Sequence, residues 1–247
     1  TMETIKLKIN GIEVTAPKGS TILEAARLAH IEIPTLCFLK EINEIGACRV
    51  CIVELKNGKL VTSCVYPAED GMEVFTNTPK VMDSRKKTIQ LLLSNHNRSC
   101  LSCVRSGHCE LQELAHSLGV EDESYYDGEM TEIDTSAAHM IRDNSKCILC
   151  RRCVAVCSEV QGIGVIGANN RGFATEIGSA FGMGLGETSC VSCGQCIAVC
   201  PTGALQEKDC TSEVFAAIAD PSKHVIVQTA PAVRAALGEE FGLPIGT

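Results

Sequence analysis

The 247-residue chain contains no tryptophan, and only 4% of its residues are aromatic. No uninterrupted apolar run approaches roughly 18 residues, so we expect no membrane span. The formal net charge of −8 and the lack of a basic patch argue against nucleic acid as a partner. The first residues show neither the apolar region nor the cleavage site of a secretory signal peptide. Together these absences predict a cytoplasmic protein.

Cysteine, in contrast, is abundant, with 16 residues. In a reducing cytoplasm, clustered cysteines bind metals more often than they form disulfides. Fifteen of the 16 fall into four groups, and Cys210 is left over. We interpret Cys210 as an ordinary thiol that behaves as a small apolar residue, with a ligand exchange or another contact as the alternative.

Two of the groups form an internal repeat. "CILCRRCVAVC" (147–157) and "CVSCGQCIAVCP" (190–201) both follow the spacing C-x2-C-x2-C-x3-C of bacterial ferredoxins, and Pro201 follows the second copy. Three thiolates in one tight loop bind three corners of a cubane, while the fourth reaches the other cluster. Zinc is the alternative, because C-x2-C pairs also build zinc sites. The predicted [4Fe–4S] ligand sets are Cys147, Cys150, Cys153 and Cys200 for one cluster and Cys157, Cys190, Cys193 and Cys196 for the other.

The first group lies in a β-rich segment and has the spacing C-x10-C-x2-C-x12-C. This loosely resembles plant-type [2Fe–2S] ligation, although the first gap is longer than in plant ferredoxins. We predict a [2Fe–2S] cluster here and keep zinc as the alternative. Its ligands would be Cys37, Cys48, Cys51 and Cys64.

The remaining group, "HNRSCLSCVRSGHC" (96–109), reads H-x3-C-x2-C-x5-C. In isolation it fits a zinc site with three thiolates and one imidazole as well as it fits an iron–sulfur site. Its position between the other groups favours a His-ligated [4Fe–4S] cluster. His108 competes as the nitrogen donor, but its neighbour Cys109 makes it awkward for both to reach separate corners. The predicted ligands are His96, Cys100, Cys103 and Cys109.

The pattern of elements predicts an α+β, multi-domain chain. Asn10-Gly11 and Asn57-Gly58 indicate hairpins. Between them Thr21 and Glu24 form a capping box before a helix whose apolar residues include Leu28, and Pro34 is expected to stop that helix. The glycine-rich insert 162–186 is not followed by a convincing helix, so strands and turns are favoured over a nucleotide site. The expected domains are a β-grasp [2Fe–2S] ferredoxin-like domain (1–78), a small helical His-ligated [4Fe–4S] domain (79–139), a two-cluster ferredoxin-like domain (140–210) and the truncated beginning of an α/β domain with helix, strand and helix (211–247). The acidic segment 121–129 is expected to be a linker or surface loop.

In this order, the motifs resemble the accessory-cluster region of [FeFe]-hydrogenases, especially the multisubunit, NAD(P)-linked, electron-bifurcating members found in anaerobes. The resemblance rests on "GACRVCIVEL", "CLSCVRSGHCELQ", "IRDNSKCILCRRC", "CGQCIAVCPTGAL" and "VIVQTAPAVRAALGEEFG". More distantly, the chain is similar to the large iron–sulfur subunit of complex I. The last motif resembles the beginning of the catalytic H-cluster domain, whose cysteine motifs are absent from these residues.

The resemblance implies an electron-transfer arm of a hydrogenase complex. Electrons would pass between an H-cluster, expected only in a further C-terminal part, and flavin- and NAD(P)H-oxidising iron–sulfur subunits, with ferredoxin as another possible partner. No residue here is expected to be catalytic beyond electron transfer. The alternatives are an iron–sulfur subunit of an NADH-quinone oxidoreductase or formate dehydrogenase, or a non-enzymatic redox or zinc-binding protein.

Overall fold

The computed structural model describes residues 3–120 and 133–244, and the acidic segment 121–129 lies outside them. The chain divides into two compact units, Thr1–Lys208 and Asp209–Thr247. Among the described residues, no helix is long and apolar enough to cross a membrane.

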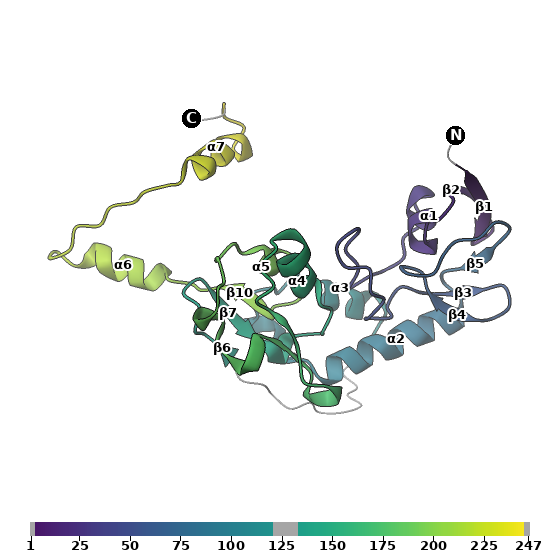
Figure 1. Ribbon diagram of the computed structural model, residues 1–247, viewed down its shortest axis with the longest axis horizontal. Coiled ribbons are helices and arrows are strands. Elements are labelled where there is room, and N and C mark those ends of the chain that lie inside the picture. The colour runs from purple at the N-terminus through teal and green to yellow at the C-terminus, as the bar shows by residue number, and fades with distance from the viewer. Residues whose placement is uncertain (1–2, 121–132, 245–247) are drawn as a thin grey trace. The chain divides into compact units, whose positions relative to one another are not determined.

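The first unit begins with a five-stranded sheet in the order β2-β1-β5-β3-β4 (Figure 1). β1 pairs with β5 in parallel, and the other neighbours pair antiparallel. α1 (Ile22–Leu28) packs against β2. The strands are β1 (Thr4–Ile9), β2 (Ile12–Pro17), β3 (Ile52–Leu55), β4 (Leu60–Thr62) and β5 (Glu73–Phe75).

Local sequence signals explain the start of this sheet. Asn10 and Gly11 both have positive φ, 52° and 82°, which is the two-residue hairpin turn expected from Asn-Gly. The capping box is present, since the Thr21 side chain accepts from the Glu24 amide and the Glu24 side chain accepts from the Thr21 amide. Both predictions are confirmed.

The end of α1 differs from the prediction. The helix stops at Leu28, before Pro34, and His30 has a left-handed φ of 56°. Leu28 is 58% exposed, whereas Ala25 is fully buried. The buried face of the helix therefore includes Ala25 and does not include Leu28. β5 was not predicted, since its three residues give too short a pattern.

Two helices follow the sheet. α2 (Pro79–Ser94) begins after its N-cap Thr78 and packs against β3 and against α3 (Glu110–Ser117). Gly119 follows α3 with φ 57°, which is typical of the residue after a helix. Ile89 and Leu111 join a buried cluster that also contains Cys37 and Cys150, so this core connects the sheet region with the repeat region.

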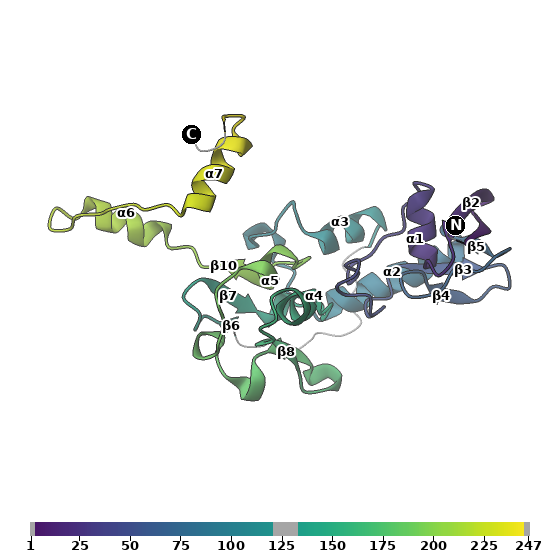
Figure 2. The same ribbon diagram turned by 45° about the horizontal axis from the view of Figure 1, so that its top comes forward.

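The repeat region contains a three-stranded sheet in the order β10-β7-β6 and a two-stranded sheet of β8 and β9. The helices α4 and α5 lie in contact with each other, and α5 also contacts β10 (Figure 2). The predicted strands and turns of the glycine-rich insert are confirmed as β8 and β9. The bounds are β6 (Ile133–Asp134), β7 (Met140–Asp143), α4 (Arg152–Ala155), β8 (Gly167–Asn169), β9 (Glu176–Gly178), α5 (Gln195–Ala198) and β10 (Leu205–Glu207).

The second unit contains α6 (Thr211–Ala219) and α7 (Pro231–Glu240). The strand predicted at 224–230 is wrong, because these residues form no ladder in the described part of the unit. An extended apolar segment becomes a strand only beside a hydrogen-bonding neighbour. The two helices were predicted at these places.

Candidate metal centres

The first cysteine group lies at one edge of the five-stranded sheet, and all four thiols are buried. Cys37 follows α1, Cys48 and Cys51 precede β3, and Cys64 follows β4. The thiols form two adjoining pairs. The sulfurs of Cys51 and Cys64 are 3.2 Å apart, and the Cys48 amide donates to the Cys37 sulfur at 3.5 Å.

The pKa values of these thiols show how tightly the pairs are coupled. A hydrogen bond from Cys37 lowers the pKa of Cys48 to about 6, and one from Cys64 lowers that of Cys51 to about 7. The pKa values of Cys37 and Cys64 are raised. The larger cause is the hydrogen bond in which each of them keeps the proton shared with its partner, and burial adds to the effect. A cation bound between the pairs would displace the remaining protons, since metal ligation requires thiolates.

A single asparagine connects this group with the repeat region. Asn43 is 3% exposed, and its side-chain amide donates to the carbonyl oxygens of Cys37 at 2.7 Å and Cys150 at 3.0 Å. Cys150 is 107 residues away from Asn43 in the sequence. The amide therefore fixes two cysteine loops against each other. No local sequence pattern marks Asn43, because its contact with Cys150 is long-range.

The second group extends from the end of α2 to the start of α3. Cys100 begins a short 3-10 turn, Cys103 ends it, and Cys109 is the N-cap residue of α3. Burial raises the pKa of Cys109, and the nearby Cys103 and Cys100 thiolates add to the effect. The structure thus brings these three thiols together.

The two histidines of this segment have different environments. Burial, followed by the charge of Lys146, lowers the pKa of His96 to about 4, so its imidazole is neutral. Its Nδ1 atom is buried without a hydrogen-bond partner, whereas His108 is exposed. The charges acting on His96 come from Lys146 and Asp143 rather than from the three thiols. A neutral imidazole with an unpartnered nitrogen is nevertheless suited to bind a metal.

The third and fourth groups line two cavities in the repeat region. The cavities share Arg142, Ile177 and Leu205 in their walls, so they adjoin each other. Each cavity is lined by three thiols of one repeat copy and the last thiol of the other. The lining thiols are Cys147, Cys150, Cys153 and Cys200 in one cavity and Cys157, Cys190, Cys193 and Cys196 in the other.

The backbone of the two copies repeats as well. Leu149 and Arg151 have positive φ, 54° and 61°, and so have Ser192 and Gly194, 57° and 71°. These residues stand two and four positions after the first cysteine of each copy. Left-handed residues turn the chain sharply, and the Leu149 amide thereby donates to the Cys147 sulfur at 3.4 Å.

Burial favours the protonated form of several thiols that line the cavities. Burial raises the pKa of Cys147 to about 11, of Cys150 to about 12 and of Cys196 to about 11. Neighbouring thiolates of the same cavity add to each shift, including Cys200 for Cys150 and Cys157 for Cys196. Metal binding must therefore release several protons.

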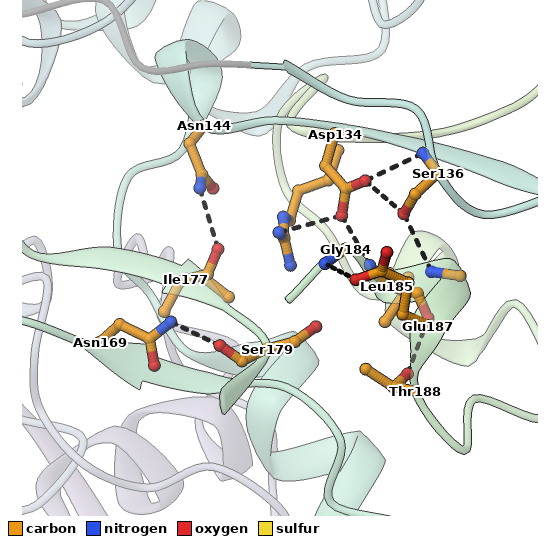
Figure 3. A network of polar contacts seen from close by, with 12 residues as sticks. Asp134, Ser136, Asn144, Asn169, Ile177, Ser179, Gly184, Leu185, Glu187 and Thr188 are labelled. Carbon is orange, nitrogen blue, oxygen red and sulfur yellow. Dashed lines mark hydrogen bonds and ion pairs between the residues drawn. The ribbon is translucent and has the colours of Figure 1, made fainter. Parts of the chain in front are cut away.

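A polar network holds the loop before Cys190 (Figure 3). The Asp134 carboxylate accepts from the Leu185 amide at 2.9 Å and pairs with Arg142 at 3.0 Å. The Gly186 amide donates to the Ser136 hydroxyl at 2.9 Å, and a Cβ on Gly186 would lie 2.3 Å from the Ser136 carbonyl oxygen. Only glycine fits at this close approach, and Leu185 and Arg142 line the cavity beside it.

The second group also packs against the repeat region. Arg152, whose side chain is 7% exposed, forms a two-pronged ion pair with Glu110 at 2.6 and 2.9 Å. Arg105 donates to the Ile197 carbonyl at 3.0 Å. A Cβ on Gly203 would lie 2.6 Å from the Cys103 sulfur. All four cysteine groups thus belong to one compact unit, while Cys210, half-buried just before α6, belongs to the other.

Within residues 3–120 and 133–244, no three Cys, His, Asp or Glu side chains converge closely enough to hold one metal ion. The thiols occur instead as adjoining pairs and as rings around cavities. Soft thiolate ligands in such sets are typical of iron–sulfur clusters and zinc.

Comparison with protein families distinguishes iron–sulfur clusters from zinc for the matched domains. Residues 2–79 match a 2Fe-2S iron-sulfur cluster binding domain, and residues 146–204 match a 4Fe-4S dicluster domain. Residues 85–124 match the NADH-ubiquinone oxidoreductase-G iron-sulfur binding region. Fold and site therefore define an iron–sulfur protein with 2Fe–2S and 4Fe–4S domains.

Individual relatives place the chain more narrowly. It is 48% identical to the NADP-reducing hydrogenase subunit HndD of Solidesulfovibrio fructosivorans, over 100% of this chain and 43% of the relative. It is 38% identical to iron hydrogenase 1 of Clostridium pasteurianum, over 96% of this chain and 42% of the relative. A crystal structure of an NAD+-reducing [NiFe]-hydrogenase in the H2-reduced state matches with a TM-score of 0.76 and 31% identity, over 83% of this chain and 87% of that chain.

The chain belongs to a family of hydrogenase subunits, and it is also similar to the NADH dehydrogenase iron–sulfur protein 1 of Solanum tuberosum, with 34% identity over 72% of this chain and 24% of the relative. It spans less than half the length of each of these curated relatives.

Proposed function

We propose that this chain is the electron-transfer arm of a cytoplasmic [FeFe]-hydrogenase complex. It would carry one [2Fe–2S] and three [4Fe–4S] clusters between an H2-converting H-cluster and flavin- and NAD(P)H-oxidising subunits or ferredoxin. The observation that carries the proposal is the pair of adjoining cavities, each lined by four thiols from both repeat copies. Bound clusters supply one-electron redox chemistry.

The ligand assignment follows from the grouping of the side chains. The pairing of Cys37 with Cys48 and of Cys51 with Cys64 supports a [2Fe–2S] cluster in the β-grasp domain, since each iron takes two thiolates. The two cavities support the exchange of the fourth ligand, with Cys200 serving the first loop and Cys157 the second.

For the remaining [4Fe–4S] cluster we assign His96, Cys100, Cys103 and Cys109. The unpartnered Nδ1 of His96 and the exposure of His108 favour His96 as the nitrogen donor. A neutral ligand leaves this cluster one negative charge lighter than a four-thiolate cluster, which raises its reduction potential.

Serine substitutions test the ligand sets. In anaerobically purified full-length protein, Cys157→Ser should alter the electron paramagnetic resonance (EPR) signal of the same cluster as Cys193→Ser. Cys200→Ser should alter that of the other cluster. Cys210→Ser is the matched control and should leave iron, acid-labile sulfide and all signals unchanged. Signals that group Cys157 with Cys153 would contradict the exchange, and zinc without sulfide would refute the clusters.

A second function, in an NADH-quinone oxidoreductase, is favoured by the match of residues 85–124 to the NADH-ubiquinone oxidoreductase-G region. The two functions differ in the electron donor. If the native complex belongs to a hydrogenase, H2 should reduce its clusters, and NAD+ or NADP+ should reoxidise them. Reduction by NADH with no response to H2 would support the second function.

A further inference from the structure

Arg85 is a buried cation beneath the first cysteine group. It stands in the second turn of α2, on the face that packs against β3, and is 5% exposed. Its Nε donates to the Val50 carbonyl at 3.1 Å, and its Nη2 donates to the Ile52 carbonyl at 2.7 Å. These two carbonyls flank Cys51, so the guanidinium clamps the backbone on both sides of this thiol.

The charge of Arg85 is balanced by no carboxylate of residues 3–120 and 133–244. In the part of the chain that the structure describes, no Asp or Glu forms an ion pair with Arg85. Burial lowers its pKa to about 10, and the charge opposing this shift is the Cys51 thiolate. A buried charge without a partner is strongly unfavourable, so the folded protein needs an anion nearby. Among the thiols of the first group, Cys51 is the one whose negative charge acts on Arg85.

We propose that Arg85 is a positioning residue that holds the Cys51 loop in place, and that its buried charge raises the reduction potential of the [2Fe–2S] cluster. This inference rests on the ligand set of the proposed function. By ligand and iron bookkeeping such a cluster carries about −2 when oxidised and about −3 when reduced. A fixed positive charge therefore stabilises the reduced state more than the oxidised state.

The expected size of the shift in reduction potential follows from the Coulomb interaction in a protein interior. A unit charge within roughly 10 Å changes a one-electron equilibrium by about tenfold or more. The same factor corresponds to about 59 mV for a one-electron couple. Arg85 has this effect because it is buried, whereas an exposed lysine of the same helix is screened by water.

Redox titration of the [2Fe–2S] EPR signal tests the inference in the anaerobically purified full-length protein. Arg85→Gln should shift the potential in the negative direction by the equivalent of about tenfold or more. Arg85→Lys keeps the charge and should stay near the unmodified protein. The matched control is Lys87→Gln, which removes one charge from a side chain on α2 that is 60% exposed and should leave the potential unchanged.

Every outcome of this titration either supports or overturns a stated part of the proposal. An unchanged potential in Arg85→Gln, or an equal shift in Arg85→Lys, would overturn the charge effect. Loss of the [2Fe–2S] signal from Arg85→Gln alone would show that the cluster needs the charge. Loss from both variants would overturn the charge effect and support only the clamp on the Cys51 loop, because a lysine ammonium cannot reproduce the fork of the guanidinium. An unmodified protein without any [2Fe–2S] signal would instead refute the ligand set of the proposed function.

Discussion

The close approach of Gly203 to Cys103 gives a sharp test of how two cysteine groups are packed together. A Cβ at position 203 would lie 2.6 Å from the Cys103 sulfur, whereas ordinary contacts begin at 3.4 Å. Gly203→Ala must therefore displace the sulfur or the backbone by about 0.8 Å. Metal sites tolerate deviations of only about 0.2 Å in their bond lengths.

Gly203→Ala should impair cluster binding more than it destabilises the fold. A metal-free thiol can rotate away from the new methyl group, but a thiolate bound to a cluster cannot. We expect Gly203→Ala to lose or distort the cluster of the second group, with up to about four iron atoms missing per chain. The overpacking itself should destabilise the holoprotein by about 1–3 kcal/mol.

The assay combines iron and sulfide analysis with EPR of the reduced protein. Gly167→Ala is the matched control, because a Cβ there meets nothing within 4 Å and the residue has no left-handed φ. It should keep all iron and every signal. A Gly203→Ala protein with full iron and an unchanged spectrum would refute the packing of Cys103 against this glycine.

Three further predictions concern the fold around the sites. Asn43→Ala should lower the free energy of unfolding by about 2–4 kcal/mol, since two buried carbonyls lose their donor. The exposed control Glu13→Ala should change it little, and anaerobic denaturant unfolding measures both. Desolvation raises the pKa of Asp134, but hydrogen bonds from Ser136 and Leu185 and the Arg142 charge outweigh it, so the folded pKa lies below 3.8. The Asp134 carboxylate therefore stabilises the fold above that pH, and this stabilisation is lost as the pH falls through the folded pKa. The difference in the free energy of unfolding between the unmodified protein and Asp134→Asn should be constant near neutrality and should vanish below about pH 4. A difference that widens in acid would contradict this. Thr21→Ala should lower the free energy of unfolding by about 1 kcal/mol through loss of the capping box, and an effect no larger than that of Glu13→Ala would refute this role.

The family comparisons agree with the two classes of cluster, 2Fe–2S and 4Fe–4S, that the cysteine spacing predicts. The spacing is informative because the ligands of one cluster loop lie within a few residues of one another. The cysteine spacing also predicts how the thiols are grouped around the two cavities, since the internal repeat indicates that each copy supplies the fourth ligand of the other cluster. In the same way, Asn10-Gly11 and the Thr21 capping box are local signals, and the structure contains both elements where they were predicted.

Local sequence patterns therefore account for the cysteine groups, the first hairpin and the helix that follows it. Tertiary structure alone decided which distant residues support these groups. Asn43 reaches Cys150 across 107 positions, and Gly203 lies against Cys103. Arg85 is buried because α2 packs against β3, and the sequence around Arg85 does not indicate this contact. Tertiary structure also decided that residues 224–230 form no strand, because a strand exists only with a neighbour, and no spacing in the sequence records which segments become neighbours.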